Sequence, residues 1–128
     1  MAILNFKYVN AAASGVETFA TSFEGASYEI KSASFTQNGA TVPTDSTDFR
    51  TLTLQDCSGN TIGTITTNSG DADGTALTQN VRVPFIMSGR QNAILAANEQ
   101  VKVAGTKGGS GKVADGIVSL EIVAARAY

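Results

Sequence analysis

The stretch that decides the fold runs from Val81 to Ala125. In chain order it reads VRVPFIMS (81–88), QNAILAANEQ (91–100), VKV (101–103), GTKGGSGK (105–112) and IVSLEIVA (117–124). In the last segment every second residue is apolar, which is the period of a β-strand with one buried face. We therefore expect strands on both sides of a glycine hairpin. The residues expected on the inner face of the last strand are Val118, Leu120, Ile122 and Ala124.

Two parts of this stretch depart from a regular strand pattern. VRVPFIMS also alternates, but Pro84 has no backbone N–H to donate and so predicts an edge position or a bulge. Asn92–Glu99 has the only helical pattern in the sequence, and it is short. We expect one turn of helix or an irregular loop there, which buries Ile94 and Leu95.

The segment Ser27–Thr36 supplies a strand that covers this core. Tyr28 and Ile30 start on one face, but Phe35 falls on the opposite face if the strand is regular. One extra residue would restore the pattern, so we expect a bulge near Ser32–Ser34.

A hairpin is predicted in the middle of the chain. Phe49–Asp56 places Leu52 and Leu54 on one face and threonines on the other. Ser58–Asn60 contains a glycine and is short enough for a tight turn, and Thr61–Asn68 forms the returning strand.

Seven or eight short strands separated by Gly, Asn and Asp predict an all-β, single-domain antiparallel β-sandwich. The long crossing loops fit a jelly-roll topology at least as well as an immunoglobulin-like order. We expect the sandwich over residues 27–128. Residues 1–26 are expected to form an extended N-terminal arm and one peripheral strand.

The expected arm carries large apolar residues that would be costly to leave in water. We therefore predict that the arm contacts either this domain or a neighbouring molecule. Residues with an expected interface role are Ile3, Leu4, Phe6, Tyr8, Arg126 and Tyr128. The alternative is that Phe6 and Tyr8 complete the sheet of their own domain. A separate arm would allow deletion of Met1–Ala13 without unfolding the sandwich.

The composition narrows the classes of partner. Charged residues make up 16% of the chain and the net charge is −2, with lysines and arginines spread singly. Nucleic-acid binding requires clustered cations, so we expect no nucleic-acid partner. No segment approaches the length of a membrane span, so we expect no membrane partner. A hydroxyl-rich surface of low charge favours permanent protein contacts.

The glycine-rich segment GTKGGSGK resembles two catalytic motifs but matches neither. GTKGGSGK has Thr106 where a phosphate-binding loop needs glycine and Val113 where it needs Ser or Thr, and a strand follows it instead of a helix. Ser110 lacks the closing glycine of a nucleophile elbow, and the chain contains no histidine to activate it. We therefore expect no catalytic residues, no cofactor and no enzymatic activity.

A calcium site is the one metal hypothesis that the sequence leaves open. Asp71 and Asp73 could join Asp45 or Asp48 in a loose cluster of carboxylates. The competing interpretation is that these are ordinary turn aspartates that accept backbone hydrogen bonds. We expect no bound metal.

The amino-acid sequences and the order of several segments resemble those of a known protein family. The segments are Asp48–Leu54, the Gly-Asn hairpin, Gly74–Thr78, Val83–Ser88, Leu95–Glu99 and Thr106–Gly111. They are similar to the small β-sandwich virion proteins of tailed bacteriophages, in particular the jelly-roll capsid decoration (cement) proteins. The resemblance covers roughly residues 27–125.

The resemblance implies a protein assembled in the host cytoplasm and located on the outer capsid surface of the virion. It implies that the major capsid protein is the partner and that the chain bridges neighbouring capsid subunits. It also implies self-association as a homotrimer, with a homodimer as the alternative. The alternative function is a head-fibre or tail-appendage module that binds a host receptor or glycan.

Overall fold

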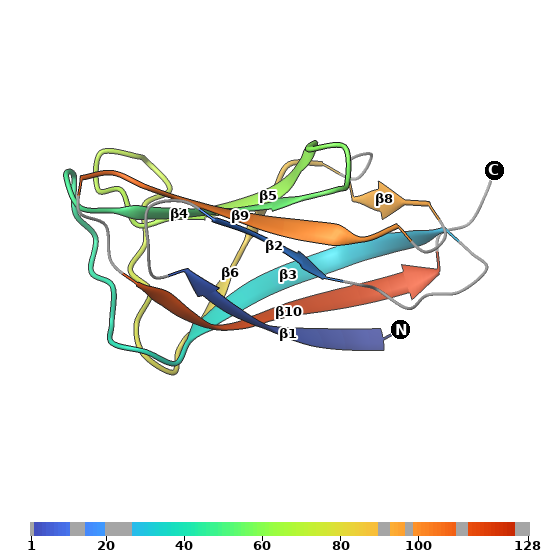
Figure 1. Ribbon diagram of the computed structural model, residues 1–128, viewed down its shortest axis with the longest axis horizontal. Helices are drawn as coiled ribbons and strands as arrows, with labels where there is room; N and C mark the ends of the chain where they lie inside the picture. The colour runs from blue at the N-terminus through green and yellow to red at the C-terminus, as the bar shows by residue number, and fades with distance from the viewer. Residues whose placement is uncertain are drawn as a thin grey trace.

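The computed structural model describes residues 2–10, 15–19, 27–89, 93–96, 99–109 and 113–124. These residues form ten strands and their connecting loops. No helix in these ranges is long and apolar enough to cross a membrane. The strands build two antiparallel sheets that pack face to face, so the predicted all-β sandwich is confirmed (Figure 1).

Each sheet contains five strands. Sheet A has the order β1-β10-β3-β6, and β8 also pairs with β3. Its strands are β1 (Ala2–Asn10), β3 (Tyr28–Gln37), β6 (Arg82–Pro84), β8 (Ile94–Leu95) and β10 (Ala114–Ala124). Sheet B has the order β2-β9-β4-β5-β7. Its strands are β2 (Gly15–Phe19), β4 (Arg50–Gln55), β5 (Thr61–Thr66), β7 (Ile86–Met87) and β9 (Val101–Lys107).

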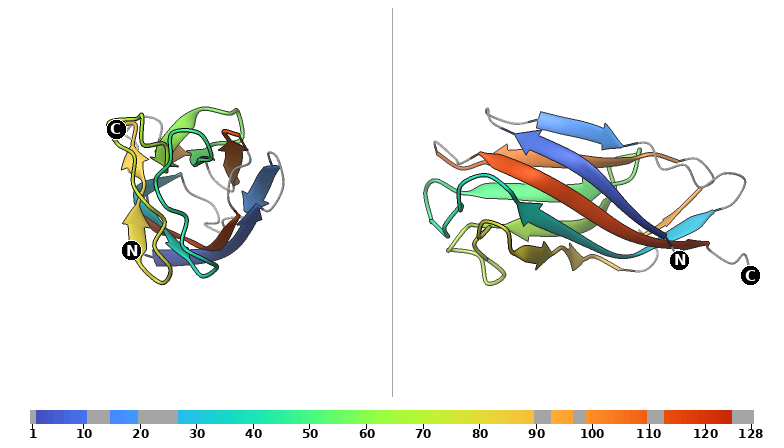
Figure 2. Two further views of the ribbon diagram at one scale, coloured as in Figure 1. Left: turned by 90° about the vertical axis from the view of Figure 1, so that its left-hand side faces the viewer. Right: turned by 90° about the horizontal axis from the view of Figure 1, so that it is seen from below.

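Consecutive strands alternate between the two sheets. Among the ten described strands, only β4 and β5 follow each other within one sheet, and every other connection crosses from one sheet to the other. The views in Figure 2 show the two layers and the loops that join them at both ends. Each sheet therefore needs the other one in order to bury its apolar face.

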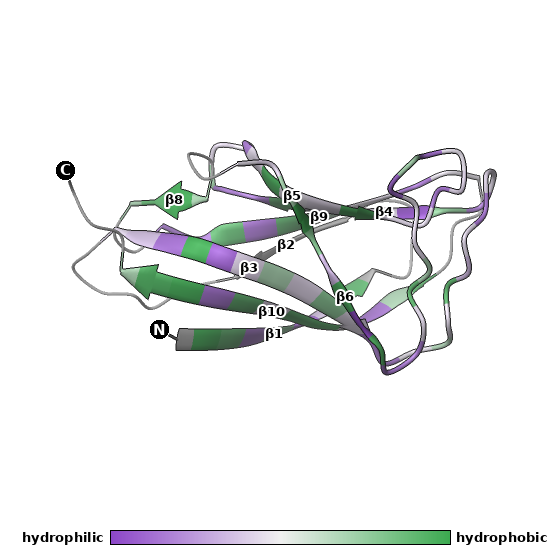
Figure 3. Cartoon of the chain, turned by 180° about the vertical axis from the view of Figure 1, so that it is seen from behind, coloured by the Kyte–Doolittle hydropathy of each residue, from purple (hydrophilic) through white to green (hydrophobic). Residues whose placement is uncertain are grey.

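The predicted alternation of buried and exposed residues is present in the long strands. Along β10, positions 114 to 122 alternate between buried and half-buried, and Val118, Leu120 and Ile122 face the core as predicted. Ala124, the last residue of the strand, is exposed and does not contribute to the core as predicted. Figure 3 shows the same alternation of hydropathy along β3 and β10.

The predicted bulge in β3 is confirmed, one residue earlier than expected. Ser32 pairs with Glu121 and Ile30 pairs with Ile122, so Lys31 is the extra residue. The bulge moves the inner face from Tyr28 and Ile30 to Ala33 and Phe35, and all four side chains are buried.

The predicted hairpin joins β4 to β5. Leu52 and Leu54 are fully buried, as expected from their spacing. Asp56 Oδ1 accepts hydrogen bonds of 2.9 Å from the backbone N–H groups of Ser58 and Asn60. Gly59 has φ of +88°, a conformation that favours glycine, so this turn depends on that residue.

Arg50 is a buried cation that the sequence analysis did not anticipate. Its side chain is 1% exposed and shares the inner face of β4 with the two leucines. Its backbone N–H donates a 2.9 Å hydrogen bond to Thr67 Oγ1, and its carbonyl accepts from Thr67 N–H at the same distance. Burial lowers the pKa of the Arg50 guanidinium, and nearby Tyr8 opposes that shift.

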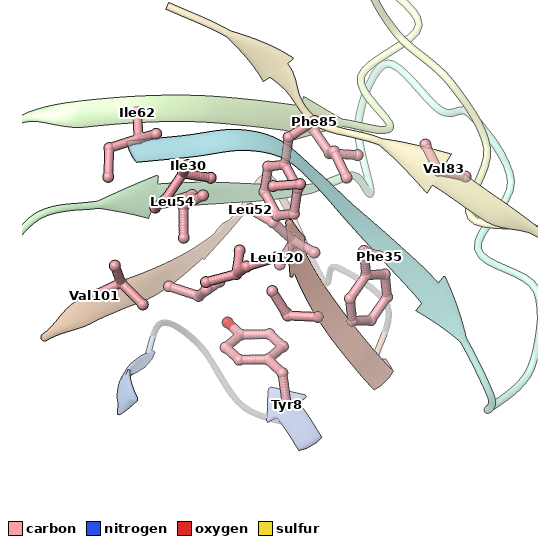
Figure 4. Close-up of a cluster of buried hydrophobic side chains, with 14 of the residues drawn as sticks. Tyr8, Ile30, Phe35, Leu52, Leu54, Ile62, Val83, Phe85, Val101 and Leu120 are labelled. Carbon is pink, nitrogen blue, oxygen red and sulfur yellow. The ribbon is translucent and has the colours of Figure 1, made fainter. Parts of the chain in front are cut away.

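Residues 2–10 do not form an arm separate from the sandwich. They form β1, which pairs with β10 from Ala2↔Ile122 to Asn10↔Ala114. Tyr8 is 1% exposed and points into the same core cluster as Phe35 and Leu120 (Figure 4). The alternative in which this segment completes its own sheet is therefore correct for the described residues. Deleting Met1–Ala13 would remove a complete strand, so we now expect this deletion to destabilise the sandwich.

The prediction of a helical turn or loop for Asn92–Glu99 also needs correction for the residues that the structure describes. Ile94 and Leu95 form the short strand β8 beside Tyr28 and Glu29 of β3. Leu95 is 2% exposed, whereas Ile94 is 38% exposed. A strand places neighbouring side chains on opposite faces, so the two residues cannot both enter the core.

Pro84 lies at the position that its missing N–H predicted. It ends β6, the short strand at one end of sheet A. The chain then crosses to sheet B, where Ile86 and Met87 form β7. Val83 and Phe85 are buried on the way, while Val81 is 49% exposed and does not share their environment.

Candidate interaction surfaces

The outer side of β1 is the first candidate surface. β1 ends sheet A, so it pairs with β10 on one side and with no other described strand in that sheet. Ile3 is 62% exposed and Val9 is 41% exposed, with exposed Asn5 and Lys7 between them on the same face. Of the predicted interface residues, Ile3 is exposed on this surface, where another molecule could contact it.

The inner side of β1 has a different role. The ring of Tyr8 contacts that of Phe35 edge to face, with a centroid distance of 6.2 Å and an interplanar angle of 86°. Leu4 and Phe6 are partly buried and pack against the core. These three predicted interface residues therefore stabilise the sandwich itself. The predicted residues Arg126 and Tyr128 lie outside the described residues.

Val9 is a surface residue that the sequence analysis missed. The signal was present, because Ile3 and Val9 are separated by an even number of positions and must share a face of a regular strand. In the extended arm that we expected, no face is buried, so this spacing carries no information. In β1, which pairs with β10 along one side, residues separated by an even number of positions share the exposed face.

The outer face of sheet A is held together by side-chain hydrogen bonds between neighbouring strands. Ser119 Oγ donates to Asn5 Oδ1 at 2.6 Å, which links β10 to β1. Arg82 Nε donates to Ser34 Oγ at 2.8 Å, which links β6 to β3. These contacts satisfy hydrogen-bonding groups of neighbouring strands within the sheet.

The outer face of sheet B is a regular array of hydroxyl groups, which we call the threonine face. Its members are Thr51, Thr53, Thr64 and Thr106, together with Thr66, which is only 8% exposed. One row across the sheet contains Thr106, Thr51 and Thr66, and the next contains Ala104, Thr53 and Thr64. The hydroxyls of Thr51 and Thr66 lie 2.9 Å apart and share a hydrogen bond. Neither row contains an ionisable side chain.

A groove borders the threonine face and has a volume of about 280 Å³. The residues that line it are Thr64, Thr66, Asp71, Asp73, Ile86, Met87 and Ser88. Ile86 is 51% exposed, so the groove is lined by exposed apolar surface as well as by two carboxylates. This combination can receive a ligand that has both hydrogen-bond donors and apolar surface.

The carboxylates proposed for calcium are turn residues in this structure. Asp45 Oδ1 accepts from the backbone N–H groups of Thr47 at 2.7 Å and Asp48 at 2.9 Å. Asp71 Oδ1 accepts from Asp73 N–H at 2.8 Å. Within the described ranges, no three His, Cys, Asp or Glu side chains are placed to hold one metal ion. The structure therefore does not bring the proposed calcium ligands together.

No protein-family model, curated protein or solved structure matches this chain. The surfaces described above and the resemblance of the sequence segments are therefore the basis for the function proposed below.

Proposed function

We propose that this chain is a virion structural protein that decorates the outer surface of a phage capsid and stabilises it. In this proposal the chain bridges neighbouring subunits of the major capsid protein. The observation that carries the proposal is the threonine face, a regular array on sheet B whose central rows contain no ionisable side chain.

The physical reason is the cost of removing charges from water. The centre of a protein interface is depleted in charged residues, because an imperfectly paired buried charge destabilises the complex. A face of threonine hydroxyls and methyl groups can be covered by another protein without this penalty. Many copies on one shell add many such contacts, so modest affinity per copy is sufficient.

The strand order supports a jelly-roll topology, the finer part of the fold prediction. The sheet with the order β1-β10-β3-β6 faces the sheet that contains β2-β9-β4-β5. The chain alternates between the two sheets except at the β4–β5 hairpin. This is the order expected for two interlocked Greek keys. The topology agrees with the resemblance to decoration proteins, although fold by itself does not define function.

The proposal includes assembly in the host cytoplasm, self-association as a homotrimer or homodimer, and a structural rather than enzymatic role. Its test is reconstitution on capsid shells that lack the protein, followed by cryo-EM and heating. We expect density on the outer surface at symmetry axes and a higher temperature of shell rupture. Shells that bind no protein would overturn the proposal.

A pair of variants tests whether the threonine face makes the contact. Thr53→Lys places a charge at the centre of the face, and we expect at least about a tenfold loss of shell affinity. Thr78→Lys adds the same charge at an exposed loop residue and serves as the control. Equal shell binding by both variants would exclude the threonine face as the docking surface.

The groove beside Asp71 and Asp73 favours a second candidate function. Carboxylates and threonine hydroxyls are hydrogen-bonding groups that can orient a glycan or another polar host ligand. This is the function of a head-fibre or tail-appendage module. Binding to host cells that is lost in Asp73→Asn, without binding to capsid shells, would favour this candidate.

A further inference from the structure

The ends of the two sheets are not equally protected against pairing with another strand. β6 has three residues and includes a proline, while β7 and β8 have two residues each. Short strands and proline are devices that prevent pairing at a sheet edge. β1 has nine residues, contains no proline, and runs without a register shift. It is the long edge among the described strands.

The sequence of β1 is self-complementary in an antiparallel sense. Residues 3–9 read ILNFKYV, and the pattern of apolar and polar residues is symmetric about Phe6. Ile3 and Val9 are the exposed apolar residues at the two ends, and Asn5 and Lys7 are the polar residues between them. A strand with this symmetry can pair with a copy of itself and match like with like on both faces.

We propose that a second copy of this chain pairs with β1 through its own β1, so that sheet A continues across a two-fold axis at Phe6. In this register Ile3 lies opposite Val9 of the second copy, and Asn5 lies opposite Lys7. The inference concerns the free protein and does not rest on the capsid function. It selects a homodimer contact where the resemblance implied a homotrimer first.

Neighbouring registers fit less well. A shift by one residue places outward side chains opposite inward ones, which a continuous sheet does not allow. A shift by two residues in one direction places Lys7 opposite Lys7, a like-charge pair that destabilises the contact. The same shift in the other direction places Ile3 opposite Lys7. The register centred on Phe6 avoids all three mismatches.

A second copy would pair with β1 on the side of the strand away from β10. β1 and β2 are the end strands of their sheets and contact each other on the same side of the molecule (Figure 2). A second copy would approach from that side. Nine residues of strand span roughly 30 Å, so main-chain hydrogen bonds along this length would supply affinity. Covering Ile3 and Val9 would add apolar burial.

Charge variants test the contact in the free, full-length chain by sedimentation. We expect wild type to dimerise and Ile3→Lys to weaken the dimer at least about tenfold, because Lys would lie opposite Val9. The double variant Ile3→Lys/Val9→Glu should restore the dimer and make it salt-sensitive, because each Lys would face a Glu. Ile86→Lys, on an exposed residue of β7, is the matched control and should dimerise like wild type.

A disulfide test fixes the register independently of those variants. In a Cys57→Ser background, Asn5→Cys/Lys7→Cys should crosslink two copies under mild oxidation. Directly opposed residues in antiparallel strands have Cα atoms about 4.5–5.5 Å apart, within disulfide range. Neither Asn5→Cys nor Lys7→Cys alone should crosslink two copies. The Cα atom of the new cysteine would be about 8 Å from the Cα atom of the same cysteine in the second copy.

Three outcomes would overturn the inference. Wild type that remains monomeric at every concentration would exclude the dimer. A dimer that Ile3→Lys leaves unchanged, with its fold verified by circular dichroism, would place the contact elsewhere. Crosslinking by Lys7→Cys alone would show a different register. None of these results depends on capsid shells, so failure here and failure of the capsid proposal can be distinguished.

Discussion

Tyr8→Ala tests whether the N-terminal segment belongs to the core. The side chain of Tyr8 is 1% exposed and packs edge to face on Phe35. A separate arm could lose this side chain with little effect on folding. A core residue could not, because the ring would leave a cavity between the two sheets.

The size of the effect follows from the burial. An aromatic side chain buries about 150–250 Å². If about 120–150 Å² of that area is apolar, the loss at about 25 cal/mol per Å² is about 3–4 kcal/mol. Replacing buried aromatic residues by alanine gives about 3–5 kcal/mol, which agrees. This is a large share of the about 5–15 kcal/mol that stabilises a typical domain.

The assay is urea unfolding followed by circular dichroism. For an m-value of about 2 kcal/mol/M, the expected loss lowers the unfolding midpoint by about 1.5–2 M. Ile3→Ala is the control on the same strand, and its 62% exposed side chain should cost less than about 0.5 kcal/mol. Tyr8→Phe keeps the ring and should cost about 1 kcal/mol through the lost hydroxyl.

The comparison between the two alanine variants can refute the reasoning. If Tyr8→Ala lowers the midpoint no more than Ile3→Ala does, β1 is not part of the cooperative core. The segment would then be an arm after all. A deletion of Met1–Ala13 that remained fully stable would lead to the same conclusion.

Three further predictions concern single residues. Gly116→Ala should destabilise the fold by about 2–3 kcal/mol in urea, because the added Cβ would lie 1.9 Å from the carbonyl oxygen of Thr36. Burial alone would raise the pKa of the Asp56 carboxyl, but hydrogen bonds from Asn60 and neighbouring backbone N–H groups lower it overall. The ionised Asp56 carboxylate therefore stabilises the fold above its unfolded pKa, and this stability is lost as the pH falls through its lower pKa in the folded state. Acidification from about pH 5 to about pH 3 should therefore destabilise wild type more than Asp56→Asn. Cys57 is exposed, so a thiol reagent should label it in the folded protein at a rate close to that in urea.

The candidate surfaces could be predicted only in part. Hydroxyl-rich strand faces were expected from the threonines at 51, 53, 64 and 66, because every second residue of a strand shares a face. Their assembly into one array depends on β4 pairing with β5 in a register that places Thr51 opposite Thr66. The groove was not predicted, since it requires the loop with Asp71 and Asp73 to fold back beside β7.

The sequence by itself indicated the strands β3, β4, β5 and β10 and showed which of their faces are apolar. A period of two residues, which is a local property of the strand backbone, predicted several features. These are the inward orientation of Leu52, Leu54, Val118 and Leu120 and the bulge in β3. Except for the predicted β4–β5 hairpin, only the tertiary structure decided what each strand pairs with. The strands β9 and β10, which we expected to form a hairpin around the glycine segment, lie in different sheets. β1 and β10 lie more than 100 residues apart in sequence, and their pairing turns an expected arm into an edge strand. The burial of Arg50 has the same origin, because a shared face with two leucines becomes an interior position only when the second sheet covers it.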